Sequence, residues 1–175
     1  MPQINLDGGP HGNVTLNPGN TEEARFWGYS AKSRQLHLLR QAFSIVQKNI
    51  FKKNNHCNNY FKHLRADGSS RSFDEVWEDP SIWVSYEPRT GLGWDGLTNF
   101  VNGKEITIGE DAFRTKHVWY VTGVLVHELA HTNGAGGKPS KAAATALKYC
   151  GLAAFYDGAV GVEPRISRSG DQRYA

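Results

Sequence analysis

The chain has 175 residues, of which 39% are hydrophobic and 21% charged, a balance typical of one folded domain with a core and not of a disordered segment. The net charge is +3, the pI is about 8.9, and lysine and arginine are scattered along the chain, which argues against a nucleic-acid-binding surface. No apolar run approaches the roughly twenty residues of a membrane-spanning helix, and the first residues lack the basic and apolar segments of a signal peptide.

The N-terminal segment combines turn-forming residues with a helix-start pattern. Residues 1–20 are rich in glycine, proline and asparagine, which predicts an irregular N-terminal arm. Asn20 then stands before Thr-Glu-Glu, with Glu23 three residues further on, which is the spacing of a capping box. We therefore expect a helix to begin directly after the arm.

Two helices are predicted next. Five apolar residues at steps of three and four predict one face of a long helix, namely Leu36, Leu39, Phe43, Val46 and Ile50. A second, short helix is expected to carry Cys57, Phe61 and Leu64 on one side. The turn-forming residues 65–70 should end it.

From Ser81 onward the sequence is typical of strands. The segment SIWVSYEP predicts a strand that Pro88 ends, and residues 91–100 predict a loop followed by an extended stretch. Asn102 and Gly103 lie between two β-prone runs, as in a two-residue hairpin turn. Together these patterns predict a small antiparallel sheet.

Residues 117–131, HVWYVTGVLVHELAH, predict a helix with one face toward the core. The apolar residues of that face are Val118, Val121, Val124 and Leu125. The pair Asn133-Gly134 is expected to end this helix. Residues 139–150 predict a further helix, with proline near its start and alanine inside. Because no repeat or domain boundary is visible, residues 1–175 are expected to form a single α+β domain.

The motif His-Glu-x-x-His, formed by His127, Glu128 and His131, indicates a metal site. A helix advances about 3.6 residues per turn, so the two histidines lie one turn apart on one face. Both imidazoles can therefore reach one zinc ion at about 2.0–2.1 Å. Glu128 lies beside the first histidine, rotated by roughly 100°, where it can contact a zinc-bound water without being a ligand. Zinc lowers the pKa of that water, and the carboxylate can take its proton during attack on a carbonyl.

The neighbours of the motif are apolar and predict that the helix is buried. Val124, Leu125 and Val126 precede the motif, and Leu129 and Ala130 fill its two variable positions. Two imidazoles and a carboxylate inside a buried helix need partners, and a metal ion would provide them. The alternative is a structural helix that carries the same three residues on a solvated face.

The segment LVHELAHTNG resembles the active helix of the zincin metallopeptidases. HELAHTNG is also similar to the first eight positions of the metzincin pattern, in which a His or Asp ligand follows the glycine by three residues. That position is Gly137 here, and the only methionine is Met1, so the chain departs from the metzincin pattern. The resemblance implies a zincin-like α+β domain with a small antiparallel or mixed sheet. It also implies a metallopeptidase that hydrolyses peptide bonds with one catalytic Zn2+.

A looser resemblance covers roughly residues 40–150 and extends to small zincin-like domains of bacterial proteins, some of them toxin parts of secretion-system effectors. It implies secretion or delivery outside the producing cell. Besides a protein or peptide substrate, it implies a larger secretion or toxin polypeptide, or an inhibitor or immunity protein, as partner. It further implies a disulfide between Cys57 and Cys150, although from the residues alone the two cysteines could equally be two buried thiols.

In zincins an edge strand runs along the cleft and holds extended substrate through main-chain hydrogen bonds. The resemblance implies this role for residues 105–109, with Ile106, Thr107 and Ile108 as the substrate-binding residues. The same residues could also form an ordinary strand of the sheet.

Catalytic zinc usually has three protein ligands and a water, and the third ligand is open here. The helix after the motif has no Asp, Glu or His between residues 140 and 150. Asp157 is our first choice, followed by Glu163 and Asp171, and each could also be a surface carboxylate. By the same resemblance, a tyrosine is expected to donate to the oxyanion, and Tyr156 and Tyr149 lie in the right part of the chain, with Tyr156 as our choice. Either tyrosine could also be a packing residue.

The remaining histidines have no motif around them. His117 lies too far upstream along the helix to join the pair. We expect surface or structural roles for the others, which are His11, His37, His56 and His63.

Three functions are compatible with these patterns. The first is a zinc endopeptidase that acts as an effector or toxin domain. The second is a zincin-shaped binding module without turnover, which the lack of an obvious third ligand favours. The third is a DNA-linked zincin, which the mild positive charge permits but the lack of a basic cluster near the motif disfavours.

Overall fold

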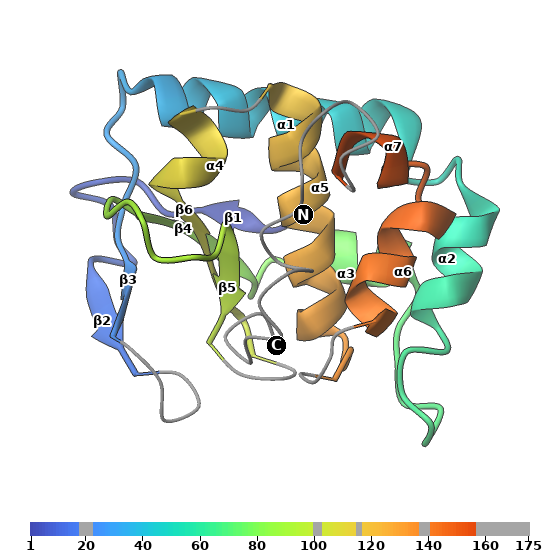
Figure 1. Cartoon of the computed structure of the whole chain (residues 1–175). Helices are drawn as coiled ribbons and strands as arrows, with labels where there is room; N and C mark the ends of the chain where they lie inside the picture. The colour runs from blue at the N-terminus through green and yellow to red at the C-terminus, as the bar shows by residue number, and fades with distance from the viewer. Residues whose placement is uncertain (18–22, 100–102, 115–116, 137–140, 157–175) are drawn as a thin grey trace.

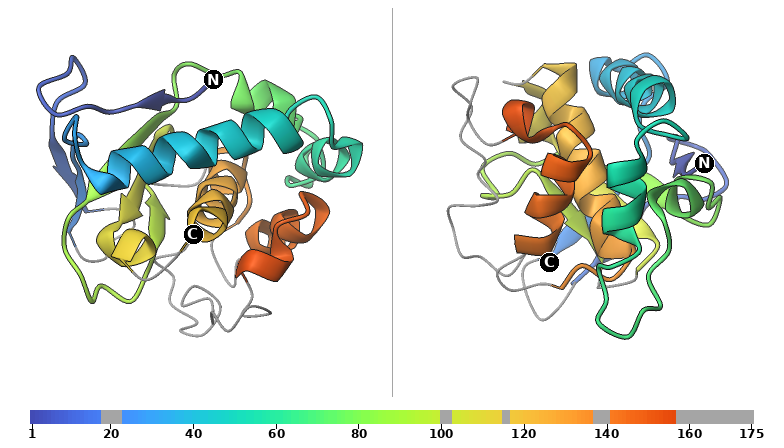
Figure 2. Two further views of the ribbon diagram at one scale, coloured as in Figure 1. Left: turned by 90° about the horizontal axis from the view of Figure 1, so that it is seen from above. Right: turned by 90° about the vertical axis from the view of Figure 1, so that its right-hand side faces the viewer.

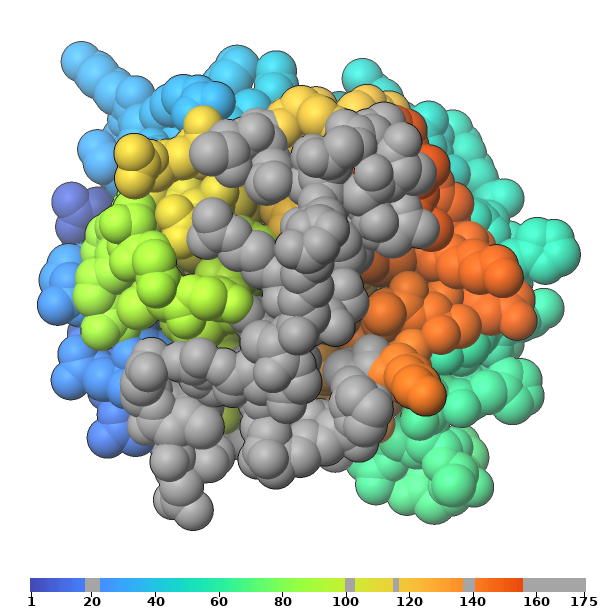
Figure 3. Space-filling model, in the orientation of Figure 1, coloured from blue at the N-terminus to red at the C-terminus, as the bar shows by residue number. Residues whose placement is uncertain are grey.

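The computed structural model describes residues 1–17, 23–99, 103–114, 117–136 and 141–156, which form an α+β fold (Figure 1). Its helices are α1 (Arg34–Asn49), α2 (Asn55–Phe61), α3 (Phe73–Trp77), α4 (Glu110–Arg114), α5 (Val118–Thr132), α6 (Lys141–Tyr149) and α7 (Ala153–Tyr156). Its strands are β1 (Gln3–Ile4), β2 (Val14–Leu16), β3 (Ala24–Phe26), β4 (Trp83–Glu87), β5 (Gly96–Thr98) and β6 (Glu105–Gly109). In the orientation of Figure 1, the surface around β5 lies to the left of the visible face and α6 to the right (Figure 3).

The main sheet is mixed, with the strand order β1-β4-β6-β5. β4 pairs in parallel with both β1 and β6, whereas β5 pairs antiparallel with β6. The predicted β5–β6 hairpin pairing is confirmed, although Asn102 of its turn lies outside the described residues. The residue patterns predicted a small antiparallel sheet, whereas the sheet is mixed, as the resemblance allowed. A long connection leads from β1 to β4, and β5 stands between β4 and β6 in the sequence, so that β4 can pair in parallel with both β1 and β6. A separate antiparallel pair consists of β2 and β3.

The N-terminal segment is more regular than its composition predicts. Residues 1–20 contain β1 and β2, so the prediction of an irregular arm is wrong there. The helix expected after Asn20 is also wrong, since the chain forms β3 at this point. Ala24 and Phe26 are buried at alternate positions of β3, which pairs with β2. Burial of alternate apolar side chains in a paired strand thus overrides the local capping pattern.

The helices predicted from periodicity are confirmed. Ser33 caps α1 by accepting a hydrogen bond from the backbone N–H of Leu36 at 3.2 Å. The predicted apolar face of α1 is buried. In α2, Cys57 and Phe61 are buried as expected, and the half-buried Leu64 follows the helix. Helices α3, α4 and α7 were not predicted, because four or five residues are too few to display a period.

A disulfide joins Cys57 of α2 to Cys150, the residue that follows α6. The pairing that the resemblance implied is therefore present. The two cysteines are 93 residues apart, and closing a loop of that length stabilises a fold by about 4–5 kcal/mol in the chain-entropy account. The rings of Tyr60 and Tyr149 stack beside it with centroids 4.6 Å apart, so the contact between these helices is also non-covalent.

Helix α5 lies at the centre of the fold. It contacts α1, α6 and α7 as well as β5 and β6 of the sheet, and α1 runs across it in Figure 1 and in the left view of Figure 2. Thirteen of its fifteen residues are buried, which confirms the prediction that this helix is enclosed. Within the described part of the chain, no helix has both the length and the apolar character needed to cross a membrane.

Candidate metal centre

The C-terminal half of α5 places three polar side chains in the protein interior. His127, Glu128 and His131 are each at most 1% exposed. The helix is surrounded by other elements, so its motif faces protein and not open solvent. Burial of three groups with strong hydrogen-bonding needs is costly unless each has a partner.

The two imidazoles lie next to each other, as their spacing on a helix predicts. The ring centroids of His127 and His131 are 4.9 Å apart, and the ring planes are inclined by 66°. Two imidazoles that bind one ion through nitrogens at about 2.0–2.1 Å have centroids at roughly this separation. The pair therefore fits one zinc ion without a change of backbone.

The turn after the motif fixes the protonation of His131. The N–H of Gly134 donates to the carbonyl of His131, and the N–H of Ala135 donates to the carbonyl of Ala130, both at 3.0 Å, which is the Schellman pattern. Gly134 has φ 97°, a conformation that glycine adopts readily. The turn brings the carbonyl oxygen of Ala135 to 2.9 Å from Nδ1 of His131. Because a carbonyl only accepts, Nδ1 carries the proton, and Nε2 is the nitrogen suited to a metal.

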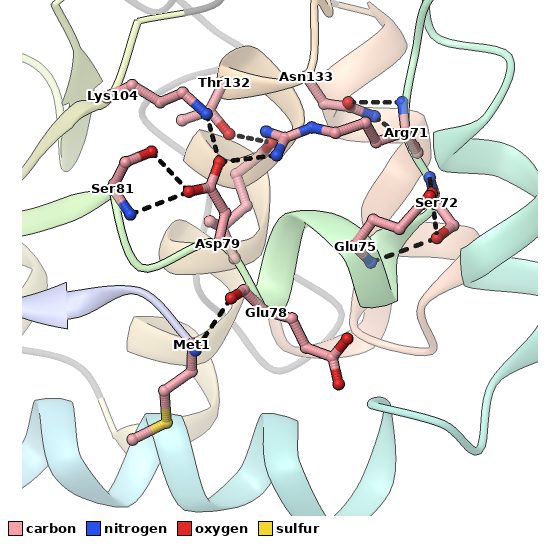
Figure 4. A network of polar contacts seen from close by, with 11 residues as sticks. Met1, Arg71, Ser72, Glu75, Glu78, Asp79, Ser81, Lys104, Thr132 and Asn133 are labelled. Carbon is pink, nitrogen blue, oxygen red and sulfur yellow. Dashed lines mark hydrogen bonds and ion pairs between the residues drawn. The ribbon is translucent and has the colours of Figure 1, made fainter.

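Asn133, which caps α5, anchors this turn to a neighbouring loop. Its Nδ2 donates to the carbonyls of Phe61 at 2.9 Å and Arg71 at 2.7 Å, and its Oδ1 accepts from the N–H of Arg71 at 2.9 Å. Arg71 in turn forms an ion pair with Asp79, which also contacts Lys104 (Figure 4). The end of α5 expected at Asn133-Gly134 is thus confirmed and held on two sides.

Glu128 faces the edge strand β5. The hydroxyl of Thr98 donates to Oε2 of Glu128 at 2.8 Å and lies 3.2 Å from the backbone oxygen of the same residue. Oε1 is buried and accepts no hydrogen bond from the residues that the structure describes. Burial raises the pKa of Glu128 to about 8, against the lowering effect of hydrogen bonds from the side chain and backbone of Thr98.

Gly96 allows β5 to pass close to this carboxylate. A Cβ atom at Gly96 would lie 2.6 Å from Cγ1 of Val124 and 2.8 Å from Oε1 of Glu128, both shorter than real contacts. Neither Gly96 nor Thr98 was identified from the sequence. A glycine inside an extended stretch often marks a place where another element approaches closely. This pattern could have identified Gly96 from the sequence.

The predicted substrate strand occupies a different position in the sheet. β6, which contains Ile106, Thr107 and Ile108, pairs with β4 on one side and β5 on the other, so the expectation of an edge strand there is wrong. Its main-chain groups are engaged on both sides, and the three residues are buried. The edge of this sheet next to α5 is β5.

The remaining predicted site residues lie at or beyond the end of the described chain. Tyr156 is the last residue of α7, a helix that contacts α5. The three candidate third ligands, Asp157, Glu163 and Asp171, lie outside the described residues. Over residues 1–156 apart from the gaps, no three His, Cys, Asp or Glu side chains gather as a metal-binding group.

Among the other histidines, His11 has structural contacts, as expected, and His117 lies away from the His127–His131 pair. His11 stacks on Trp83 with ring centroids 4.2 Å apart and lies 2.9 Å from a carboxylate oxygen of Glu105. His117 is the exposed N-cap residue of α5, at the opposite end of the helix from His131.

Comparisons with family models, with curated proteins and with solved structures found no match for this chain. The geometry around α5 and β5 is therefore the basis for a functional assignment.

Proposed function

We propose that the chain is a zinc-dependent metallopeptidase of zincin type. The observation that carries the proposal is the buried His-Glu-x-x-His helix, whose histidine rings lie 4.9 Å apart and whose glutamate lies against an edge strand. A structural helix would not require three buried polar groups at these positions.

The described residues suit a zinc ion. His127 and His131 would hold it, and the carbonyl of Ala135 orients the second ring in the way that outer partners of metal-binding histidines commonly do. We propose an oxygen of Asp157, Glu163 or Asp171 as the third ligand. A bound zinc ion would act as a Lewis acid, lowering the pKa of water toward neutrality and polarising the substrate carbonyl.

In this proposal Glu128 is the general base. With Oε2 held by Thr98, Oε1 is the oxygen that takes the proton from the attacking water and later delivers it to the leaving amine. The low-dielectric surroundings strengthen these interactions. Tyr156 is the proposed hydrogen-bond donor to the oxyanion, a role taken from the resemblance alone.

We propose β5 as the strand that holds the substrate. It is the antiparallel edge of the main sheet and contacts the motif helix. In the described part of the chain, no strand pairs with its outer side. An extended peptide could therefore add to β5 through main-chain hydrogen bonds, which would place its backbone beside Glu128.

The test combines metal analysis with one substitution. We expect about one zinc per purified chain, and Glu128→Gln should keep the zinc while losing about 10²–10⁴-fold in the rate of casein or peptide cleavage. The matched control is Glu78→Gln, which alters a carboxylate that is 54% exposed. Equal cleavage by wild type and Glu128→Gln would refute the mechanism, and absence of zinc would refute the metal site.

A setting outside the producing cell is the second part of the proposal. The Cys57–Cys150 disulfide supports it, because such bonds persist mainly in oxidising compartments. We propose an effector or toxin domain with a protein substrate and an inhibitor or immunity protein as partner. Export of the wild type to the periplasm of a bacterial host should slow growth, while Glu128→Gln should not. Identical growth of the two strains would contradict this role.

A further inference from the structure

Two residues of β5 form the surface against which Glu128 rests. Side chains alternate along a strand, so Gly96 and Thr98 face the same side, toward α5. Thr98 donates to Oε2 of Glu128 at 2.8 Å, and the missing side chain of Gly96 leaves the space that Oε1 and Cγ occupy. The carboxylate is thus bounded by contacts with one strand.

These contacts distinguish the two oxygens of the carboxylate. Oε2 has a hydrogen-bond donor, whereas Oε1 is buried and accepts none from the described residues. Thr98 is itself only 2% exposed, so its hydroxyl needs a partner inside the protein. The backbone oxygen of Glu128, at 3.2 Å, is within reach, yet the carboxylate oxygen is the closer acceptor.

We propose that Thr98 is a positioning residue for Glu128. By holding Oε2, its hydroxyl selects one orientation of the carboxylate and leaves Oε1 as the oxygen that takes the proton from the attacking water. Gly96 also positions the carboxylate, since any side chain there would displace Oε1. This inference rests on the proposed peptidase function and adds the element that orients its base.

The kinetic test uses the full-length, zinc-loaded chain. Thr98→Val keeps the shape of the side chain and removes the hydroxyl, and it should lower kcat by about 10–100-fold, since misplaced catalytic groups cost up to about 10²-fold. KM and the zinc content should stay near the wild-type values. Thr98→Ser restores the hydroxyl and should recover kcat to within about threefold.

The matched control is Thr122→Val. Thr122 is a buried threonine of α5 whose hydroxyl donates to the backbone carbonyl of Val118, in its own helix, at 2.8 Å. It should reduce stability without a selective loss of kcat. If Thr98→Val and Thr122→Val have the same kcat, Thr98 does not position the base, even in an active peptidase.

A second readout does not depend on peptidase activity. In the metal-free chain, the urea midpoints of Thr98→Val, Glu128→Gln and the double variant form a cycle. We expect the double shift to differ from the sum of the single shifts, because the hydroxyl and the carboxylate touch. Additive shifts would overturn the contact itself. A wild type that binds zinc but cleaves nothing would instead overturn the peptidase proposal, and the role of Thr98 with it.

Discussion

Two carboxylates near the C-terminal half of α5 have pKa values shifted in opposite directions. Glu128 is fully buried with Thr98 as its described side-chain donor, and burial raises its pKa to about 8. Asp79 is also partly buried, but hydrogen bonds from Lys104, Ser81 and Arg71 outweigh burial and hold its pKa well below the usual range (Figure 4).

The difference separates groups that stabilise the fold from groups suited to chemistry. Asp79 has two cations and the N–H and hydroxyl of Ser81 around it, so its charge is favoured in the folded protein. Burial acts on Glu128 without a cation beside it in the described part of the chain, so its charge is disfavoured until a ligand binds. The cluster around Asp79 holds the loop that anchors Asn133, and so supports the site without taking part in it.

The largest expected effect follows from removing a histidine. His131→Ala should lower zinc affinity by more than the 10–100-fold typical of outer partners, and should abolish cleavage. His117→Ala is the control on the same helix, since His117 is exposed at the other end. Competition with a chromogenic chelator measures both affinities. Equal zinc affinity in the two variants would show that His131 is not a zinc ligand.

The second effect is a pH dependence that only the buried carboxylate should produce. In the metal-free chain, the folded pKa of Glu128 is about 8, above its usual 4.5, so the folded state binds the proton more tightly. Below about pH 4.5 the carboxyl is protonated in both states and costs no stability. As the pH rises toward 8, the free energy of unfolding falls by up to about 1.4 kcal/mol per pH unit. At pH 7 the loss of unfolding free energy is on the order of 3 kcal/mol. In urea unfolding measured at several pH values, Glu128→Gln should remove this dependence of the unfolding free energy on pH. Parallel plots of unfolding free energy against pH for the two proteins would contradict the prediction.

A smaller effect of opposite sign is expected for Asp79. Its folded pKa is depressed, so the charged form contributes stability above the unfolded pKa of about 4, and this is lost as the pH falls. Asp79→Asn should cost about 1 kcal/mol at pH 7, a modest value because Arg71 and Lys104 are 34% and 41% exposed. The variant should lose less stability than wild type between pH 5 and pH 2. An equal acid-induced loss would show that Asp79 is not a stabilising carboxylate.

The smallest effect belongs to an exposed pair. Glu78 lies 2.9 Å from Lys52, and the two side chains are 54% and 65% exposed. Glu78→Gln should change the free energy of unfolding by less than about 0.5 kcal/mol, because solvent screens such pairs. A change as large as that of Asp79→Asn would mean that burial does not separate the two carboxylates.

Much of the helical structure was predictable because the evidence for it is local. The apolar period of α1 and the Asn133-Gly134 stop of α5 depend on residues within a few turns of each other. The same holds for the spacing of His127 and His131. The apolar surroundings of the motif also predicted its burial.

The sheet and the support of Glu128 were not predictable in the same way. The order of β6 and β5 depends on which strands meet across the fold, and period-2 patterning carries no information about neighbours. Continuous apolar runs are typical of interior strands, and β6 has such a run. The prediction of an edge strand did not use this signal. Thr98 meets Glu128 across 30 positions of sequence, so only tertiary structure identifies it.

The exposed residues 66–69 lie within the loop that the Cys57–Cys150 disulfide closes. A single cleavage of the backbone there, whether by the protein itself or by another enzyme, would produce two fragments that remain linked by the disulfide. The larger piece would keep α5 and β5, and the smaller would keep α1 pressed against them. Such a nicked molecule would migrate as intact on a gel until a reductant was added, so autolysis during storage would pass unnoticed under non-reducing conditions.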